Sequence, residues 1–198
     1  MKKIIKKRNL GMILGLFLFI IALLYYSFQF ISFKQAKKEL DVFFSNYITD
    51  MNTVGVGITP DNSSDKKEQY KDIIDKYWTE EDNDLYSQND EELNTMADLK
   101  TAIFNALESN NLESIGTLNS SYYSFNLERI DSKNYEMYVN INTSINAENY
   151  EGNYISIYGP TYFFDQSPHE YITVQFRKEQ GSWQIVGITA SDSNESFW

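Results

Sequence analysis

The sequence predicts an α+β protein: one N-terminal transmembrane helix, then amphipathic helices packed on a curved, cone-like antiparallel sheet. Three observations predict this fold. The 22 residues from Leu10 to Ile31 carry no charge. Apolar residues then recur at helical spacing as far as residue 108. From residue 115 the spacing changes to the two-residue alternation of strands, and helices followed by long strands are typical of the α+β class.

The apolar segment is long enough to cross a bilayer. As a helix it measures about 33 Å, against a hydrocarbon core of about 30 Å. A cleaved signal peptide is the alternative, but its apolar region is normally about 7–15 residues long, so the longer run favours an uncleaved anchor in the cell membrane. Basic residues lie on both sides, five before the segment and three after it: Lys2, Lys3, Lys6, Lys7 and Arg8, then Lys34, Lys37 and Lys38. This bias predicts a single-pass protein with a cytoplasmic N-terminus and an extracytoplasmic C-terminal domain.

The predicted organisation follows from the anchor. It comprises a cytoplasmic basic tail (1–9), the transmembrane helix (10–33), a juxtamembrane helix and linker (34–63), the extracytoplasmic α+β domain (64–191) and a C-terminal tail (192–198). All 28 acidic residues lie at or beyond Glu39, where only nine basic residues are found. Such an acidic domain argues against nucleic-acid binding and favours either simple solubility or a basic protein partner. The chain contains no cysteine, which excludes disulfides.

Three helices are expected between the anchor and the sheet. Residues 34–50 continue helically with one apolar stripe, which can dock on its own domain or pair with a second copy in a homo-oligomer: Leu40, Phe43, Phe44, Tyr47, Ile48 and Met51. A helix at about 65–81 is expected to be capped by Ser64 or Asp65, and one at about 90–108 by Asp90. The acidic run at 79–84 is interpreted as a solvated turn, because it lacks the glycine and terminal glutamate of an EF-hand loop.

The strands follow in pairs. In the stretch 135–145, Tyr135, Met137 and Val139 point one way while Glu136 and Tyr138 point the other, which is the clearest half-buried strand. It pairs with a strand near 122–130 across the turn at 131–134. Shorter strands are expected at 153–158 and 161–164, separated by Gly159-Pro160, and a closing hairpin at 171–178 and 183–190.

The closing hairpin, YITVQFRKEQGSWQIVGITA, carries a resemblance. With helices first and long antiparallel strands later, it resembles a nuclear transport factor two-like (cystatin-like) cone over residues 65–191. Together with the single anchor, this layout is similar to the bitopic VirB-type assembly subunit of type IV secretion (conjugation) channels. The resemblance implies a cone-like fold and a scaffold without catalysis, and no functional residue is transferred from it.

Catalysis has little support in the sequence. His169 is the only histidine, in the stretch DQSPHEY beside Asp165 and Glu170, and a histidine with a carboxylate meets the minimum for acid–base chemistry. Its place after Pro168, at a strand entrance, favours a surface residue. One histidine and no cysteine leave no usual zinc ligand set, and no nucleotide-binding or nucleophile motif is present. The sequence therefore predicts no catalytic residue, no metal site and no cofactor.

Binding of a protein is the predicted function. Fifteen tyrosines are available, and tyrosine supplies contact area and a hydroxyl at low entropic cost. The alternative is that the tyrosines pack beneath helices. The predicted partner-binding residues are Tyr122, Tyr138, Tyr154, Tyr158, Tyr162, Glu128, Glu136, Glu148 and Glu151. We expect a scaffold subunit of an envelope secretion or conjugation complex. The alternative is a membrane-tethered immunity protein that neutralises a toxin at the cell surface through an acidic, tyrosine-rich sheet face.

Overall fold

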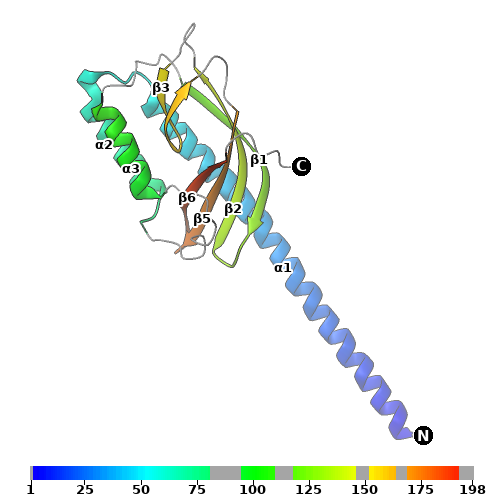
Figure 1. Cartoon of the computed structure of the whole chain (residues 1–198). Coiled ribbons are helices and arrows are strands. Elements are labelled where there is room, and N and C mark those ends of the chain that lie inside the picture. Colours follow the sequence, from blue (N-terminus) through cyan, green and yellow to red (C-terminus); the bar gives the residue numbers. More distant parts are fainter. Residues whose placement is uncertain (1, 81–94, 110–117, 146–151, 164–168, 192–198) are drawn as a thin grey trace. The chain divides into compact units, whose positions relative to one another are not determined.

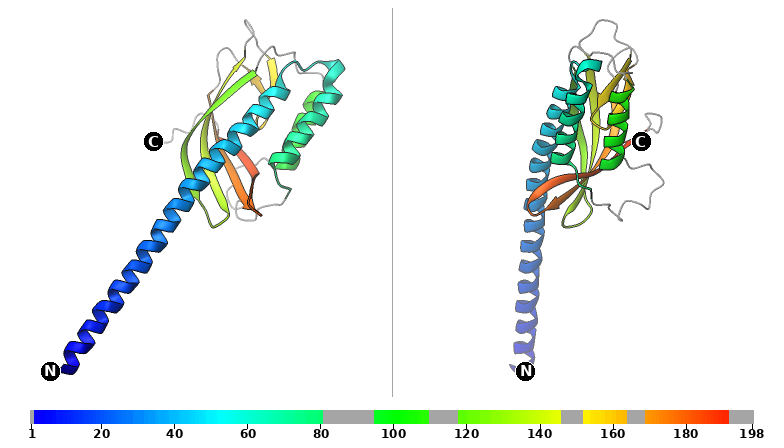
Figure 2. Two further views of the ribbon diagram at one scale, coloured as in Figure 1. Left: turned by 180° about the vertical axis from the view of Figure 1, so that it is seen from behind. Right: turned by 90° about the vertical axis from the view of Figure 1, so that its left-hand side faces the viewer.

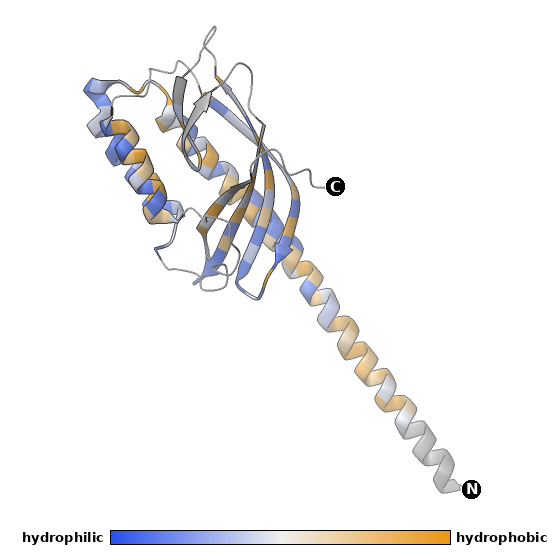
Figure 3. Cartoon of the chain, in the orientation of Figure 1, coloured by the Kyte–Doolittle hydropathy of each residue, from blue (hydrophilic) through white to orange (hydrophobic). Residues whose placement is uncertain are grey.

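The computed structural model describes residues 2–80, 95–109, 118–145, 152–163 and 169–191. It divides into two compact units, residues 1–41 and 42–198. The first unit is formed by the N-terminal part of helix α1 (Lys2–Gly55). Large apolar side chains from Met12 to Ile31 are exposed along this part of α1, which is the orange run in Figure 3. Among the described residues, α1 is the one helix long and apolar enough to cross a membrane.

The second unit confirms the α+β class. After α1 come a 3-10 turn (Pro60–Asn62), α2 (Ser63–Tyr77) and α3 (Met96–Glu108), and α2 and α3 run side by side (Figure 1). The strands are β1 (Leu118–Arg129), β2 (Asn134–Ile145), β3 (Gly152–Ser156), β4 (Gly159–Phe163), β5 (His169–Glu179) and β6 (Ser182–Ser191). The main sheet is antiparallel with the order β1-β2-β5-β6, whereas β3 and β4 form a separate two-stranded hairpin.

The apolar stripe of α1 docks on its own domain, which is one of the two predicted alternatives. The ring of Phe44 lies 5.1 Å from Tyr122 of β1 and 5.9 Å from Phe176 of β5, measured between centroids. The hydroxyl of Tyr47 donates a hydrogen bond to the carbonyl oxygen of Ile157, in the turn between β3 and β4. We call the sheet face that receives α1 the inner face, and the opposite one the outer face.

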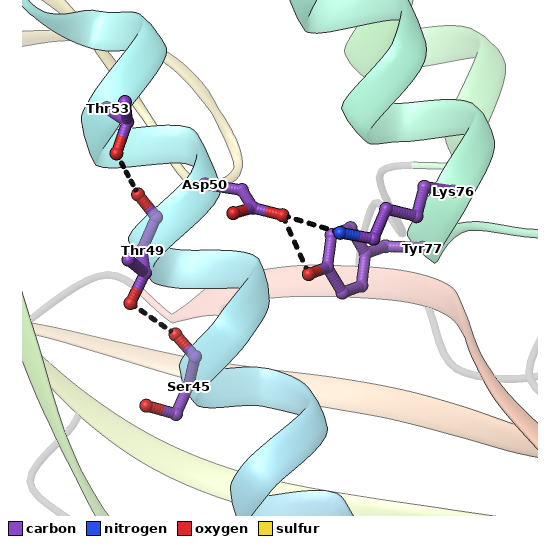
Figure 4. A network of polar contacts seen from close by, with 6 residues as sticks. All are labelled: Ser45, Thr49, Asp50, Thr53, Lys76 and Tyr77. Atoms are coloured by element: carbon purple, nitrogen blue, oxygen red, sulfur yellow. Dashed lines mark hydrogen bonds and ion pairs between the residues drawn. The ribbon is translucent and has the colours of Figure 1, made fainter.

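Polar contacts fix α2 against α1 (Figure 4). Asp50 Oδ2 accepts hydrogen bonds from Lys76 Nζ at 2.9 Å and from the Tyr77 hydroxyl at 2.8 Å. Burial raises the pKa of Asp50, but these two donors outweigh burial and leave that pKa below its usual value. On the same helix, the Thr49 hydroxyl donates to the carbonyl of Ser45. Asp50 therefore connects α1 to α2.

The C-terminal end of α1 is capped from α2. Lys66 Nζ donates to the carbonyl oxygens of Val54 at 2.8 Å and Val56 at 2.7 Å. These carbonyls have no partner within the helix, and a positive charge is favourable at this end of its dipole. Gly57 then reverses the chain with a φ of +64°, a conformation that favours glycine.

The predicted boundaries of α2 and α3 are corrected. The residue before α2 is Asn62, not Ser64 or Asp65, and it makes no side-chain capping bond. Helix α2 ends at Tyr77, because Trp78 is extended and pairs with Ile185 of β6. Helix α3 is capped by Thr95, whose side chain accepts from the backbone of Asp98. The predicted cap Asp90 and residues 81–84 of the acidic run lie outside the described residues.

The predicted alternation of β2 is confirmed, and the sheet is curved as expected (Figure 2). Bulges at Phe125 in β1 and Val186 in β6 interrupt the pairing registers. A bulge bends its strand and increases the local twist, so these two residues contribute to the curvature. The predicted break at Gly159-Pro160 is shifted: the turn is Ile157–Tyr158, and Gly159 already begins β4.

The turn between β1 and β2 is organised by one carboxylate. Asp131 Oδ1 accepts the backbone N–H groups of Lys133 at 2.7 Å and Asn134 at 2.8 Å. The bond from the Lys133 N–H is the largest of the effects that lower the pKa of Asp131. The hydroxyl of Thr95 similarly lowers the pKa of Asp98 at the start of α3.

Candidate interaction surface

The register of the sheet decides which side chains reach the outer face. Along β2, Met137 and Val139 are buried against the inner side, whereas Glu136 and Tyr138, which alternate with them, are partly exposed on the outer side. Residues opposite one another in an antiparallel pair share a face. The outer face therefore collects Tyr123 and Tyr171 around Asn140, and further along the strands Glu128 and Gln175 around Glu136.

Four aromatic residues form the outer aromatic cluster: Tyr123, Phe125, Tyr138 and Tyr171. The ring of Phe125 lies 6.0 Å from Tyr138 and 6.4 Å from Tyr171, between centroids. Tyr123 is 70% exposed, Phe125 49% and Tyr171 40%. The cluster spans β1, β2 and β5. It is an exposed apolar surface with hydroxyl groups, which is the composition of many protein-binding sites.

Beside the cluster lies a second group, which we call the acceptor row: Glu128, Glu136 and Gln175. The Tyr138 hydroxyl donates to Glu136 Oε2 at 2.9 Å, and Gln175 Nε2 donates to Glu136 Oε1 at 3.4 Å. Glu128 Oε1 accepts from Asn126 Nδ2 at 3.0 Å. These donors are neutral. Within the described part of the chain, no basic side chain lies within ion-pairing distance of either carboxylate.

Two predicted site residues are placed elsewhere, and this corrects the predicted surface. Tyr122 lies opposite Ile141 on the inner face, half-buried against Phe44. Tyr154 is fully buried beside Leu118. The bulge at Phe125 reverses the order of faces along β1, so that Tyr122 lies on the inner face and Glu128 on the outer face.

The other predicted residues divide into two groups. Tyr138, Glu128 and Glu136 lie on the outer face, and Tyr158 is half-buried in the turn after β3. The side chain of Tyr162 and all of Glu148 and Glu151 lie outside the described residues. His169 is the first residue of β5, opposite Asn142, and its side chain is not described either. The binding role of these residues stays a prediction.

Sequence reasoning missed Tyr123, Phe125, Tyr171 and Gln175. Phe125 was assigned to the strand near 122–130 without a face, and no residue type marks the bulge at which it is exposed. Tyr171 was assigned to a strand without a face. The β1–β2 register places Tyr123 and Phe125, and the β2–β5 register places Tyr171 and Gln175.

The rest of the described surface is a weaker candidate for a binding site. A shallow groove between α2, α3 and β6 is lined by charges of both signs, and there Lys100 Nζ pairs with Asp75 Oδ1 at 2.5 Å. Its charges therefore compensate one another. Among the described residues, no group of three or more histidine, cysteine or acidic side chains is placed to hold a metal ion.

The fold and the surface together define a class: an α+β domain that follows an apolar N-terminal helix and carries an aromatic and acidic outer sheet face. No family model matches the chain, and neither a curated protein nor a solved structure matches it.

Proposed function

We propose that this chain is a non-catalytic, membrane-anchored protein-binding module that contacts its partner through the outer face of the sheet. The observation that carries the proposal is the outer aromatic cluster, in which three large rings are exposed on β1 and β5, the two strands on either side of β2. Aromatic residues of this kind supply most of the binding energy at many protein interfaces. The apolar part of α1 holds the domain at the membrane, and the excess of basic residues before it favours an extracytoplasmic domain.

As the particular role, we propose a scaffold subunit of an envelope secretion or conjugation complex. Two features support this role: a single anchor followed by one α+β domain, and a surface suited to contact with another subunit. Tethering to the membrane raises the local concentration of the domain around an envelope complex, so that even modest contact areas bind effectively.

A second role, that of an immunity protein, is favoured by a different observation. Glu128 and Glu136 lie directly opposite one another and are bound only by neutral donors among the described residues. An acidic row beside exposed aromatics complements a basic toxin approaching the cell surface, and charge complementarity of this kind accelerates association.

The test uses site-specific photo-crosslinking of the full chain in its native membrane. A photoreactive phenylalanine analogue replaces Tyr123 or Phe125 on the outer face, and Thr53 on the exposed side of α1 as the matched control. We expect partner crosslinks at the first two positions and none at Thr53. Crosslinks to channel subunits or to a second copy support the scaffold role, and crosslinks to a single basic toxin support the immunity role. Crosslinks confined to Thr53, or none at either outer position, contradict the proposed function.

The orientation is tested separately. Because the chain has no cysteine, a single Ser144→Cys substitution at an exposed position of β2 reports topology directly. In intact, wall-stripped cells we expect this cysteine to react with a membrane-impermeant maleimide. Reaction only after lysis would place the domain on the cytoplasmic side.

A further inference from the structure

We propose that the acceptor row, formed by Glu128, Glu136 and Gln175, receives an arginine side chain of the partner protein. This inference rests on the proposed function, because it names the chemical group that the same outer face recognises. It adds a specific contact to a surface otherwise described by its exposed rings.

The first argument is the unpaired charge. Glu128 and Glu136 are directly opposite in the β1–β2 register, which brings their side chains to about 4.5–5.5 Å at Cβ. Like charges at this separation repel one another, and the donors bound to them among the described residues are neutral. A guanidinium between them would neutralise one charge and bridge both carboxylates with its planar fork of N–H groups.

The second argument is an independent one, and it concerns Gln175. Its side chain is 6% exposed, and its amide oxygen has no hydrogen-bond partner among the described residues. A buried acceptor without a donor costs free energy that binding can recover. Because Gln175 Nε2 already donates to Glu136, the amide lies at the edge of the carboxylate pair.

The third argument distinguishes the ligand. The two carboxylates of the acceptor row and the Gln175 amide oxygen are hydrogen-bond acceptors, and arginine carries five N–H donors and no acceptor. The ring of Tyr138 lies next to the row, and the ring of Phe125 lies 6.0 Å from that of Tyr138. A flat guanidinium stacks on aromatic faces better than the compact, strongly hydrated ammonium of lysine. A metal ion fits less well, because the described residues provide no third acidic or histidine ligand here.

The experiment measures binding of a defined probe, N-acetyl-arginine-N-methylamide, to the full chain in detergent micelles. The side-chain amide of Gln175 is followed by NMR after isotope labelling of glutamine. The corresponding lysine and citrulline compounds are the matched probes, since citrulline keeps the shape of arginine and removes the charge. We expect a saturable shift of the Gln175 amide with arginine, a several-fold weaker affinity with lysine and no response with citrulline.

Variants test the position of the site. The double substitution Glu128→Gln and Glu136→Gln should abolish the response to arginine. Glu68→Gln, at an exposed position on α2, should leave it unchanged and is the matched control. Equal responses to arginine and citrulline, or no shift at Gln175, would overturn the inference.

The two proposals fail separately. If Tyr123 and Phe125 crosslink to a partner but arginine does not bind the row, the inference fails and the proposed function stands. If arginine binds but no outer position crosslinks, the row recognises arginine and the proposed protein-binding function fails.

Discussion

The hydroxyl of Tyr47 provides the sharpest test of how α1 is held by the domain. The Tyr47 side chain is fully buried, and its hydroxyl donates to the carbonyl of Ile157 in the β3–β4 turn. Burial raises the pKa of this hydroxyl, so it stays a donor at any ordinary pH. The substitution Tyr47→Phe removes only the hydroxyl. The ring can keep its contacts with Tyr77 at 5.4 Å and Trp78 at 6.4 Å, between centroids.

The expected loss of stability in Tyr47→Phe follows from the carbonyl group that loses its hydrogen-bond donor. Without the hydroxyl, the Ile157 carbonyl loses the donor that Tyr47 supplies, and leaving a buried group unsatisfied costs about 1–3 kcal/mol. For a domain of this size, each kcal/mol lowers Tm by about 2–4 °C. The matched control is Tyr123→Phe, which removes a hydroxyl from the most exposed ring of the outer aromatic cluster. We expect Tyr123→Phe to change the free energy of unfolding by no more than about 0.5 kcal/mol.

The assay is urea and thermal unfolding of the full chain in detergent micelles, followed by tryptophan fluorescence, because Trp78 lies beside Tyr47. Amide hydrogen exchange of the β3–β4 hairpin provides a local readout, and we expect faster exchange there in Tyr47→Phe. If Tyr47→Phe and Tyr123→Phe unfold at the same denaturant concentration, the hydroxyl does not hold the turn, and the reasoning is refuted.

Three further predictions concern charge and backbone. Folding lowers the pKa values of Asp50, Asp98 and Asp131. Their contribution to the free energy of unfolding is therefore complete above the unfolded pKa of about 4 and is lost as the pH falls through the lower folded values. The urea midpoint should drop in this acidic range, and it should drop less steeply in Asp131→Asn. Glu128→Gln removes one of two like charges and should raise the free energy of unfolding by about 0.2–1 kcal/mol. The same substitution should weaken the response to the arginine probe. A loss of stability in a urea titration would contradict this prediction. Gly57→Ala places a side chain at a φ of +64°, and the strain should lower the free energy of unfolding by about 1–2 kcal/mol in the same titration. The new Cβ would meet no atom within 4 Å, so a steric clash does not contribute. Unchanged stability would show that an alanine adopts this turn without strain.

The periodic parts of the fold were predictable from sequence. The stripe containing Phe44 and Tyr47 identified the buried side of α1, and the alternation from Tyr135 to Val139 identified the two faces of β2. Both patterns repeat over several turns or residue pairs, so the burial of many side chains depends on one choice of face. Because many residues share each pattern, a single irregular residue does not change the predicted buried face.

Single-residue irregularities were not predictable from sequence, and they determine which side chains reach the outer face. In β1, Tyr122 and Glu128 were both predicted to be partner-binding residues. The bulge inserts one extra residue at Phe125, so that Tyr122 and Leu127 both face the core and Phe125 is exposed. No residue type in this stretch marks the bulge. The end of α2 was missed for a related reason, because the pairing of Trp78 with Ile185 depends on a strand more than 100 residues away.

The domain already has an aromatic core without the outer aromatic cluster. Phe44, Tyr47 and Trp78 are almost completely buried between the helices and the inner face. The exposed rings of Tyr123 and Phe125 add little to this core, since side chains that stay in water contribute little hydrophobic stabilisation. We expect the like-charged pair beside them to lower the stability of the isolated domain. Both features act against stability or solubility in the free protein and become favourable when a complementary surface covers them, which is the behaviour expected of a binding site.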